Sequence, residues 1–414
     1  MTSTFFSLLG LFSGTGLFVI GVGLLSTALA LRSAALGFSD LLTGFVMAAY
    51  FAGFVVGTRL GPKIVVRVGH VRAFSAFAAT AAAALLMHPL WQAALVWALL
   101  RFVTGTCVVG LYMVIESWIN ERSTNEIRGR AFAVYQLISL CSLALGQWLI
   151  VVGGNASATP FLMAGALLSI GLVPVVLTRV TQPAPISEIK LDLRALWRLS
   201  PLGVAGTLVS ALAQSAFFTL GPVFAHHVGF DTSSIAVFMS LALLGGAALQ
   251  WPIGHFSDRV DRRIVILAVA LAGAGLAGVS WWLVDVRPAL LPAVVFFYGG
   301  VASCLYPLCV AYSNDHAPST DAMATASGLL LVYGAGAAIG PVLVGLTMEL
   351  DGPRAFWSYL MLMLLGLALF TLVRMRLREP PPAESHERFV MLARTSQSAL
   401  EMLTPEKPAD EPPQ

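Results

Sequence analysis

Two charged residues lie inside an apolar stretch, where their chemistry would be unusual. Arg101 and Glu116 both fall in the apolar stretch 91–118 of a 414-residue chain in which only 11% of the residues are charged. A bare charge in the middle of a membrane costs about 2.5–3.5 kcal/mol or more. Burial also makes a carboxyl group easier to protonate, so Glu116 could carry a proton. Arg101 could contact a substrate or take part in the coupling of that proton.

Each of the two residues also has a structural interpretation. At a rise of 1.5 Å per residue, fifteen helical residues cover about 22 Å, so Arg101 and Glu116 cannot pair with each other. Arg101 could instead bond to carbonyl groups of the first apolar segment and hold two helices together. Glu116 could form an ion pair with Arg122, which lies about one and a half helical turns away. The sequence leaves both alternatives open for both residues.

A third candidate is a dense group of charges between two uncharged stretches. Residues 254–263 read GHFSDRVDRR, and five of these ten residues are charged. The twenty-one residues on either side carry no charge. Arginine and aspartate at this spacing could form ion pairs that change with conformation. The plainer interpretation is that a short cytoplasmic loop of a membrane protein is usually basic.

The elements that must position these residues are apolar segments of membrane-spanning length. Hydrophobic residues make up 57% of the chain and its mean hydropathy is +0.83, whereas soluble domains are about 45–50% apolar. A helix needs about 20 apolar residues to cross the bilayer. The sequence therefore predicts an all-α polytopic membrane protein with twelve spans. They are 5–31, 41–60, 71–88, 91–118, 131–153, 158–178, 201–225, 234–253, 264–284, 289–312, 323–348 and 356–373.

The longest link between predicted spans divides the chain into two halves. It contains TQPAPISEIKLDLRALWR, which is polar, charged and Pro-bearing. We expect four regions: a first six-helix bundle at 1–178, a cytoplasmic linker at 179–200, a second six-helix bundle at 201–378, and a cytoplasmic, partly disordered tail at 379–414.

Basic residues are concentrated on one side of the predicted spans. Of 24 Lys and Arg residues, 20 lie on the side of the N-terminus, three lie on the other side, and Arg101 lies within a span. Cytoplasmic loops carry an excess of Lys and Arg. We therefore expect a multi-pass protein of the cytoplasmic (inner) membrane with both termini in the cytoplasm.

The two halves also match each other at a nearly constant offset of 192–194 residues. Parallel repeats of this kind place a substrate site near the membrane midplane, between the halves. Matched pairs include Gly53 and Gly245, Arg67 and Arg259, Tyr112 and Tyr306, and Glu121 and Asp315. Polar or aromatic residues away from the loops are the candidate cavity residues: Tyr50, Tyr112, Gln136, Gln147, Gln214, Tyr298, Tyr306 and Tyr333.

Several motifs resemble signatures of the major facilitator superfamily of transporters. GHFSDRVDRR is similar to its loop signature G-x-L-x-D-R-x-G-R-R, whereas the first-half copy PKIVVRVGHVR has Pro62 at the Gly position and Val66 at the acidic position. RFVTG at 101–105 resembles the family's fourth-span signature, and RGR at 128–130 resembles its R-G-[RK] motif. VGLLSTALALR and RVGHVRAF resemble the YcaD-like branch of bacterial inner-membrane proteins.

The resemblance implies that spans 1, 4, 7 and 10 line the transport path. It favours Tyr112, Gln214, Tyr298 and Tyr306, besides Arg101 and Glu116, as cavity or coupling residues, although packing is the commoner role for any one tyrosine or glutamine. It also implies a cytoplasmic gate that is closed when the transporter opens outward. The gate residues expected are Asp258, Arg259, Arg262, Arg263, Arg67, Arg128 and Arg130.

The expected function is secondary transport of a small solute by alternating access, driven by a proton gradient. The sequence lacks the GxxxxGK[ST], HExxH and nucleophile-elbow motifs, so neither ATP-driven transport nor an enzyme is expected. The alternative is a membrane sensor or scaffold that keeps the fold without transport, which intramembrane charges disfavour because they are costly.

The expected partners are a small-molecule substrate and the lipid bilayer. The arginines are scattered over short loops, which argues against a nucleic-acid surface, and we expect a monomer. Four cysteines in apolar segments show no CxxC spacing, so no metal site or cofactor is predicted. His226 and His227, at the outer end of the seventh span, could bind a metal or respond to pH, but an interfacial position explains such a pair more often.

Overall fold

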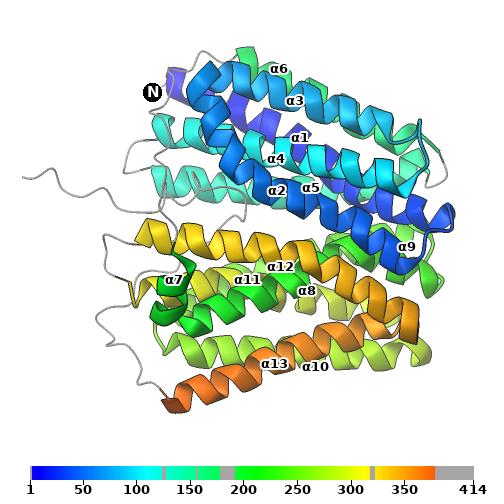
Figure 1. Ribbon diagram of the computed structural model, residues 1–414, viewed down its shortest axis with the longest axis vertical. Coiled ribbons are helices and arrows are strands. Elements are labelled where there is room, and N and C mark those ends of the chain that lie inside the picture. Colours follow the sequence, from blue (N-terminus) through cyan, green and yellow to red (C-terminus); the bar gives the residue numbers. More distant parts are fainter. Residues whose placement is uncertain (1, 124–126, 155–156, 178–191, 318–321, 378–414) are drawn as a thin grey trace, which may run out of the picture.

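The computed structural model describes residues 2–123, 127–154, 157–177, 192–317 and 322–377. Within these ranges the chain forms α-helices and one short 3-10 helix, and twelve of the helices are long and apolar enough to cross a membrane (Figure 1). The predicted all-α, twelve-span architecture is confirmed.

The helices are α1 (Thr2–Ala35), α2 (Asp40–Val68), α3 (His70–Met87), α4 (Ala94–Arg122), α5 (Arg128–Gly153), α6 (Thr159–Leu177), α7 (Leu193–Leu199), α8 (Pro201–His227), α9 (Thr232–Ser257), α10 (Arg262–Val286), η1 (Pro288–Leu290), α11 (Leu291–Asn314), α12 (Ala322–Asp351) and α13 (Ala355–Leu377).

The predicted linker 179–200 contains a helix that the sequence did not indicate. Asp192 accepts hydrogen bonds from the backbone N–H groups of Arg194 and Ala195 and so begins α7. The same bonds, the one from Ala195 first, lower the pKa of the Asp192 carboxyl and keep it ionised as a cap. Leu196 is buried against α12 beside Gly328. Residues 178–191, and the tail from 378 onward, lie outside the described residues.

Corresponding turns in the two halves have the same construction. α1 ends before Gly37, and α8 ends before Gly229, both with positive φ values of 74° and 88° that glycine adopts without strain. Two residues later, Ser39 and Asp231 cap the next helix through hydrogen bonds from backbone N–H groups. Gly37 and Gly229 are 192 residues apart, and so are Ser39 and Asp231. This is the offset at which the sequence halves match.

The same repetition is visible where helices pack closely. In the first half, a Cβ atom on Gly53 of α2 would collide with the carbonyl oxygen of Phe102 in α4. In the second half, a Cβ atom on Gly245 of α9 would collide with the carbonyl oxygen of Phe296 in α11. Small residues allow such backbone contact between membrane helices. The fold is thus two six-helix repeats, as the sequence predicts.

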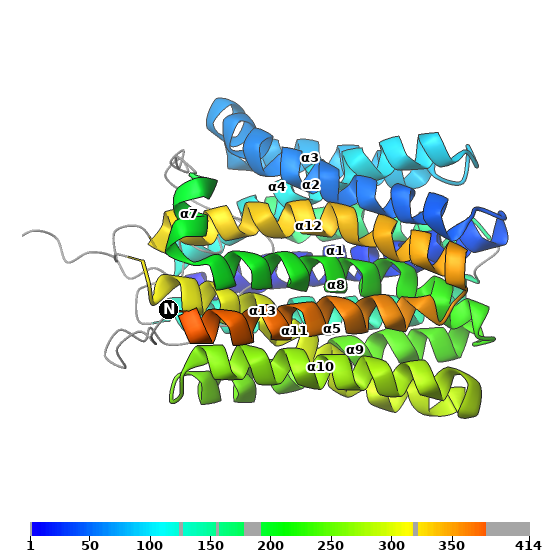
Figure 2. The ribbon, with the colours of Figure 1, turned by 60° about the horizontal axis from the view of Figure 1, so that its bottom comes forward.

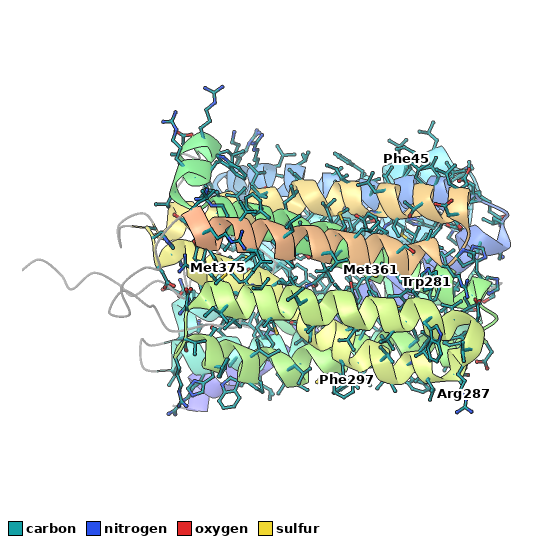
Figure 3. The ribbon with its side chains drawn as sticks, turned by 90° about the horizontal axis from the view of Figure 1, so that it is seen from below. Phe45, Trp281, Arg287, Phe297, Met361 and Met375 are labelled. Carbon is teal, nitrogen blue, oxygen red and sulfur yellow. The ribbon has the colours of Figure 1, made fainter. Side chains whose placement is uncertain are left out.

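Large apolar side chains cover the outside of the bundle. Phe45 and Phe297 are more than half exposed and point away from it (Figure 3). Arg287 lies at one end of the bundle, just outside the apolar helices (Figure 3). A lipid bilayer, and not water, is the medium that suits this surface.

The two ends of the bundle differ in composition. The basic end is the one with the turn at Gly69, the last residue of α4 (Arg122) and the turn 258–261. The far end is the one with the turns 36–39, 88–93 and 228–231. α2 and α12 lie side by side toward the far end and diverge toward the basic end, at the left of both views (Figures 1 and 2). At the far end, a Cβ atom on Gly44 of α2 would collide with the carbonyl oxygen of Pro341 in α12.

Four polar contacts between described residues join the halves, and all four lie toward the far end. They are Ser26 Oγ to the Phe218 carbonyl (3.4 Å), Leu41 N–H to Glu349 Oε2 (3.1 Å), His227 Nε2 to Asp40 Oδ1 (2.9 Å) and Ser240 Oγ to the Ala144 carbonyl (3.2 Å).

The buried apolar residues follow the same division. One core cluster crosses both halves, and its first-half members, such as Leu29, Met47 and Ile150, lie toward the far end. A second cluster, with Val65 and Trp118, contains only first-half residues toward the basic end. A third, at the basic end of the second half, has buried members from α7, α8, α11 and α12, and Phe51 of α2 packs against it. The halves therefore share one core at the far end, whereas at the basic end each half has a buried cluster of its own and Phe51 is the first-half residue that packs against the third cluster.

We predict that Gly53→Ala destabilises the fold by about 1–3 kcal/mol, because the added methyl group must displace the α4 backbone. Thermal unfolding of the purified protein in detergent measures this. Gly366→Ala is the matched control, since a Cβ atom there meets no other atom within 4 Å, and its melting temperature should be unchanged or slightly higher. Equal melting temperatures for both variants would show that the α2–α4 contact is not tight.

Candidate functional site

Arg101 is buried between helices of the first half without a carboxylate beside it. Its side chain is 4% exposed, and its guanidinium carbon lies 4.3 Å from the centre of the Tyr50 ring in α2. An arginine over an aromatic face is a favourable cation–π contact. Arg101 Nε has no hydrogen-bond partner. Of the described residues, Tyr50 in the second span is the neighbour that the structure gives to Arg101, and it belongs to neither of the two alternatives that the sequence left open.

Glu116 is fully buried on α4 and accepts a hydrogen bond from Tyr135 of α5. The distance from the Tyr135 hydroxyl to Glu116 Oε1 is 2.7 Å, and both residues are 0% exposed. A hydroxyl that donates to a carboxylate stabilises its ionised form. Tyr135 was not among the residues that the sequence indicated.

Tyr112 lies on α4 one helical turn from Glu116. Its ring packs edge-on against Phe18 of α1, with centroids 5.1 Å apart, and the residue is 7% exposed. Phe18, Tyr112 and Tyr135 all belong to or border the first-half cluster at the basic end. Arg101, Tyr112 and Glu116 thus lie along one helix, from the far half to the basic half of the membrane.

The second-half candidates are packed in different places. Gln214 of α8 donates a 2.6 Å hydrogen bond to the Ala302 carbonyl of α11. Tyr298 sits in an aromatic cluster with Phe217 and Trp357, with ring centroids 5.3 and 5.5 Å away, and its hydroxyl has no partner. Tyr306 packs against Tyr333 of α12 at 5.0 Å. The structure therefore brings Tyr306 and Tyr333 together but places Tyr298 in a packed core.

The charged loop 254–263 forms ion pairs within the second half. Arg262 is 1% exposed and donates to Asp258 Oδ1 at 3.0 Å. Its Nε lies 3.4 Å from Asp315 Oδ2 at the end of α11, and the Asp315 side chain is fully buried. Arg263 pairs with Asp261, which also caps α10. These bonds fix the turn to α11, so the loop is part of a rigid corner.

The other expected gate residues do not join this cluster in the present conformation. Arg67 and Arg130 are exposed, and Arg259 contacts His255 at 3.2 Å. The side chain of Arg128 lies outside the described residues. The structure therefore gathers Asp258, Arg262 and Arg263, whereas Arg67 and Arg130 are exposed.

At the corresponding corner of the first half, other residue types take the places of the buried ion pair. At the offsets of the repeat, Asp258, Arg262 and Asp315 correspond to Val66, His70 and Glu121. His70 is buried, its Nε2 has no hydrogen-bond partner, and its ring lies 6.3 Å from that of Trp118. Glu121 is exposed. A histidine in place of the arginine removes the permanent charge that the two acids of the second half neutralise.

We predict that Asp315→Asn lowers the free energy of unfolding by about 1.5–3 kcal/mol, the range for hydrogen bonds to charged groups, because it leaves Arg262 buried with one acid fewer. Thermal unfolding in detergent measures the loss. Glu121→Gln is the matched control at the equivalent first-half position, and as an exposed change it should stay within about 0.5 kcal/mol of wild type. Equal losses would contradict the assigned burial of the pair.

The sequence could have revealed Asp315 but not Tyr135 as a partner. The repeat pairs Asp315 with Glu121, so an acid at the end of the tenth span was visible. Nothing in the stretch AVYQL indicates that Tyr135 donates a hydrogen bond to Glu116, because that contact depends on how α4 and α5 are rotated about their axes. Among the residues described, no group of three or more His, Cys, Asp or Glu could hold a metal ion.

Comparison with known proteins gives this chain a family. The model of the Major Facilitator Superfamily matches residues 11–332 and 203–404. The chain is similar to an uncharacterized MFS-type transporter, YcaD, of Escherichia coli (strain SE11), with 28% identity over 348 residues that cover 82% of this chain and 88% of the relative. The YcaD protein of Escherichia fergusonii is also 28% identical, over 345 residues, with the same coverage of both chains.

Solved structures support the same fold. The crystal structure of the nucleoside transporter NupG superimposes with a TM-score of 0.74 at 17% identity and covers 89% of this chain and 98% of NupG. A bacterial homolog of the human lysosomal transporter Spinster, in an inward-facing and occupied conformation, gives a TM-score of 0.72 at 15% identity, with 92% and 97% coverage. At these identities the likeness concerns the fold alone. The family match over most of the chain shows more: the protein belongs to the Major Facilitator Superfamily, and it is a multi-pass membrane transporter of a small molecule and not an enzyme.

Proposed function

We propose that this protein is a secondary transporter that moves a small solute by alternating access and couples this movement to protons. One observation carries the proposal: the two halves share a core at the far end and have separate cores at the basic end. A pair of rigid bundles joined at one end only can rock so that the other end closes. A scaffold without transport has no need of such an asymmetry.

The excess of basic residues at one end indicates which side of the membrane the closed end faces. If the basic end is cytoplasmic, as the positive-inside rule requires, the structure is closed toward the outside and corresponds to an inward-facing state. The similar Spinster homolog was solved in an inward-facing conformation, which supports the assignment. We place the protein in the cytoplasmic membrane with both termini in the cytoplasm, and we expect it to act as a monomer.

Coupling is assigned to Glu116, with Arg101 as a contact for substrate or for the coupling step. Glu116 is fully buried and hydrogen-bonded to Tyr135, so its charge changes the energy of the surrounding helices when it gains or loses a proton. Arg101 is buried without an acidic partner, which leaves a positive charge free to attract a substrate group. The equivalent second-half positions are Val295 and Val310, so only the first half carries this chemistry.

We predict that Glu116→Gln abolishes uptake driven by a pH gradient while leaving substrate binding intact. The substrate is first identified by a thermal-shift screen of metabolites and drugs on the purified protein, and uptake is then measured in proteoliposomes with and without the gradient. Glu121→Gln, an exposed acid five residues further on, should keep gradient-driven uptake within about twofold of wild type, because exposed substitutions change little.

Two results would count against this function. Gradient-driven uptake that survives Glu116→Gln would remove the assigned proton carrier. If none of the compounds that shift the melting temperature is moved in any condition, the sensor or scaffold interpretation gains. Tyr135→Phe refines the outcome: loss of its hydrogen bond should change the pH dependence of uptake without changing the fold.

The charged corner at 254–263 is proposed as part of the cytoplasmic gate. When the halves close at the basic end, Asp258 would approach the N-terminus of α5, where a carboxylate is favoured by the helix dipole.

We predict that Asp258→Asn makes outward-facing protein more accessible to thiol reagents at cysteines introduced on the cytoplasmic side. Unchanged accessibility would contradict the role of Asp258 as a latch.

A further inference from the structure

An acid and a histidine join the two halves at the far end. Asp40 is the first residue of α2, in the first half, and His227 is the last residue of α8, in the second half. His227 Nε2 lies 2.9 Å from Asp40 Oδ1, and the side chains are 36% and 15% exposed. The contact is thus partly shielded but open to protons from the solvent.

Each of the two groups lies at the helix end that favours its charged form. The N-terminus of a helix carries a partial positive charge, and its C-terminus carries a partial negative charge. A negative charge on Asp40 at the start of α2 and a positive charge on His227 at the end of α8 therefore both interact favourably with the helix dipoles. The ion pair and the two helix dipoles act in the same direction.

A second contact strengthens the same junction. Glu349 of α12 accepts a hydrogen bond from the Leu41 backbone N–H at the N-terminus of α2. A Cβ atom on Gly345 of α12 would lie 2.5 Å from the Asp40 carbonyl oxygen, so α12 is in close contact with the start of α2. Both contacts exist only while the halves are packed at the far end.

The other charged groups near this end are held in their own local contacts or turned to solvent. Asp231 caps α9 through the Ser234 backbone N–H, and Arg354, before α13, is paired with Asp285. Arg32 lies in the last turn of α1, and Asp351 is the last residue of α12. His226 is exposed beside His227, with ring centroids 6.4 Å apart, and forms no ion pair with another described residue. Asp40 is the acid within bonding distance of His227.

We propose that Asp40 and His227 form a pH-sensitive clasp that favours the far-end-closed conformation at acidic pH and releases it as the pH rises. A histidine changes charge between roughly pH 5 and pH 8. The imidazolium attracts the Asp40 carboxylate with a full positive charge, whereas the neutral imidazole offers only a hydrogen bond without that charge, so the protonated pair is the stronger one. When the far end opens, the two residues separate and this preference is lost.

The direction of the effect follows from linkage. Protonated His227 stabilises the closed far end, so closure takes up a proton and is favoured as the pH falls. At alkaline pH the neutral imidazole can still share a hydrogen bond with the Asp40 carboxylate, but the ion pair is lost, and the balance moves toward the outward-open state. The clasp regulates the transport cycle proposed above and depends on it, but it is separate from the coupling assigned to Glu116.

Spin-label distances in lipid nanodiscs test the clasp without a substrate. One label pair reports the far end, through Gln92→Cys and Ser233→Cys, which are exposed positions on different halves. A second pair reports the basic end, through Val66→Cys and Phe256→Cys, which are each 59% exposed. Both pairs are placed in a Cys141→Ser background, because the other three native cysteines are buried. Distances are measured at about pH 5.5 and about pH 8, on either side of the histidine titration.

We expect the ratio of closed to open far ends to rise about two- to fivefold from the higher to the lower pH, the size expected of a partly exposed ion pair. His227→Gln keeps a donor for Asp40 but cannot titrate in this range, so the ratio should become independent of pH. Asp40→Asn should have the same effect. His226→Gln is the matched control and should keep the wild-type response.

Each other outcome decides a different point. A response that survives His227→Gln, or a wild-type ratio that does not change or changes in the opposite direction, overturns the clasp. In Asp40→Ala the distances of the two label pairs can still respond to pH in opposite directions, one end closing as the other opens. That result would leave alternating access standing and show that the clasp alone is wrong. A single fixed distance at both ends, in every variant and at both pH values, overturns the proposed alternation together with the clasp.

Discussion

The contact of α2 with α12 at the far end is the constraint on which the rest of this structure depends. In a membrane no hydrophobic force draws helices together, so association requires close packing and polar contacts. At Gly44 and Gly345 the absence of a side chain lets the two backbones meet, and at Asp40 and Leu41 polar groups bridge the halves. The same helices diverge toward the basic end (Figure 1), where the two cores are separate. Together with the α1–α8 and α5–α9 contacts toward the same end, this junction holds two bundles whose cores are separate at the basic end.

The two bundles share a backbone plan but differ in charge. Glycines at equivalent crossings, Gly53 and Gly245, allow the same close contact in each half. The charged groups break the symmetry in opposite ways. The first half carries Arg101 and Glu116 within its spans, and the second half carries the buried pair of Arg262 and Asp315 at its corner. A rigid corner in one half and titratable groups in the other are what a rocking mechanism driven by protons would need.

The sequence predicts the fold well because its signals are local. Apolar length defines the spans, and a constant offset between Gly53 and Gly245 reveals the repeat. Contacts between helices are not local, and there the sequence was less informative. Tyr135 as the partner of Glu116, and Tyr50 as the neighbour of Arg101, depend on how each helix is rotated about its axis. Tyr298 shows the converse, since a polar group on an expected path lies in an aromatic core.

The first-half loop has Val66 where the signature has an acid, and this difference follows from the absence of a buried arginine beside it. In the second half Arg262 is buried, and its permanent charge needs acids nearby, which Asp258 and Asp315 supply. His70 takes the equivalent place in the first half and can be buried as a neutral ring. An acid at Val66 would then have no buried cation to pair with, and Glu121 can turn to the solvent. Loss of the arginine and loss of the acid are thus a single change in the electrostatics of that corner.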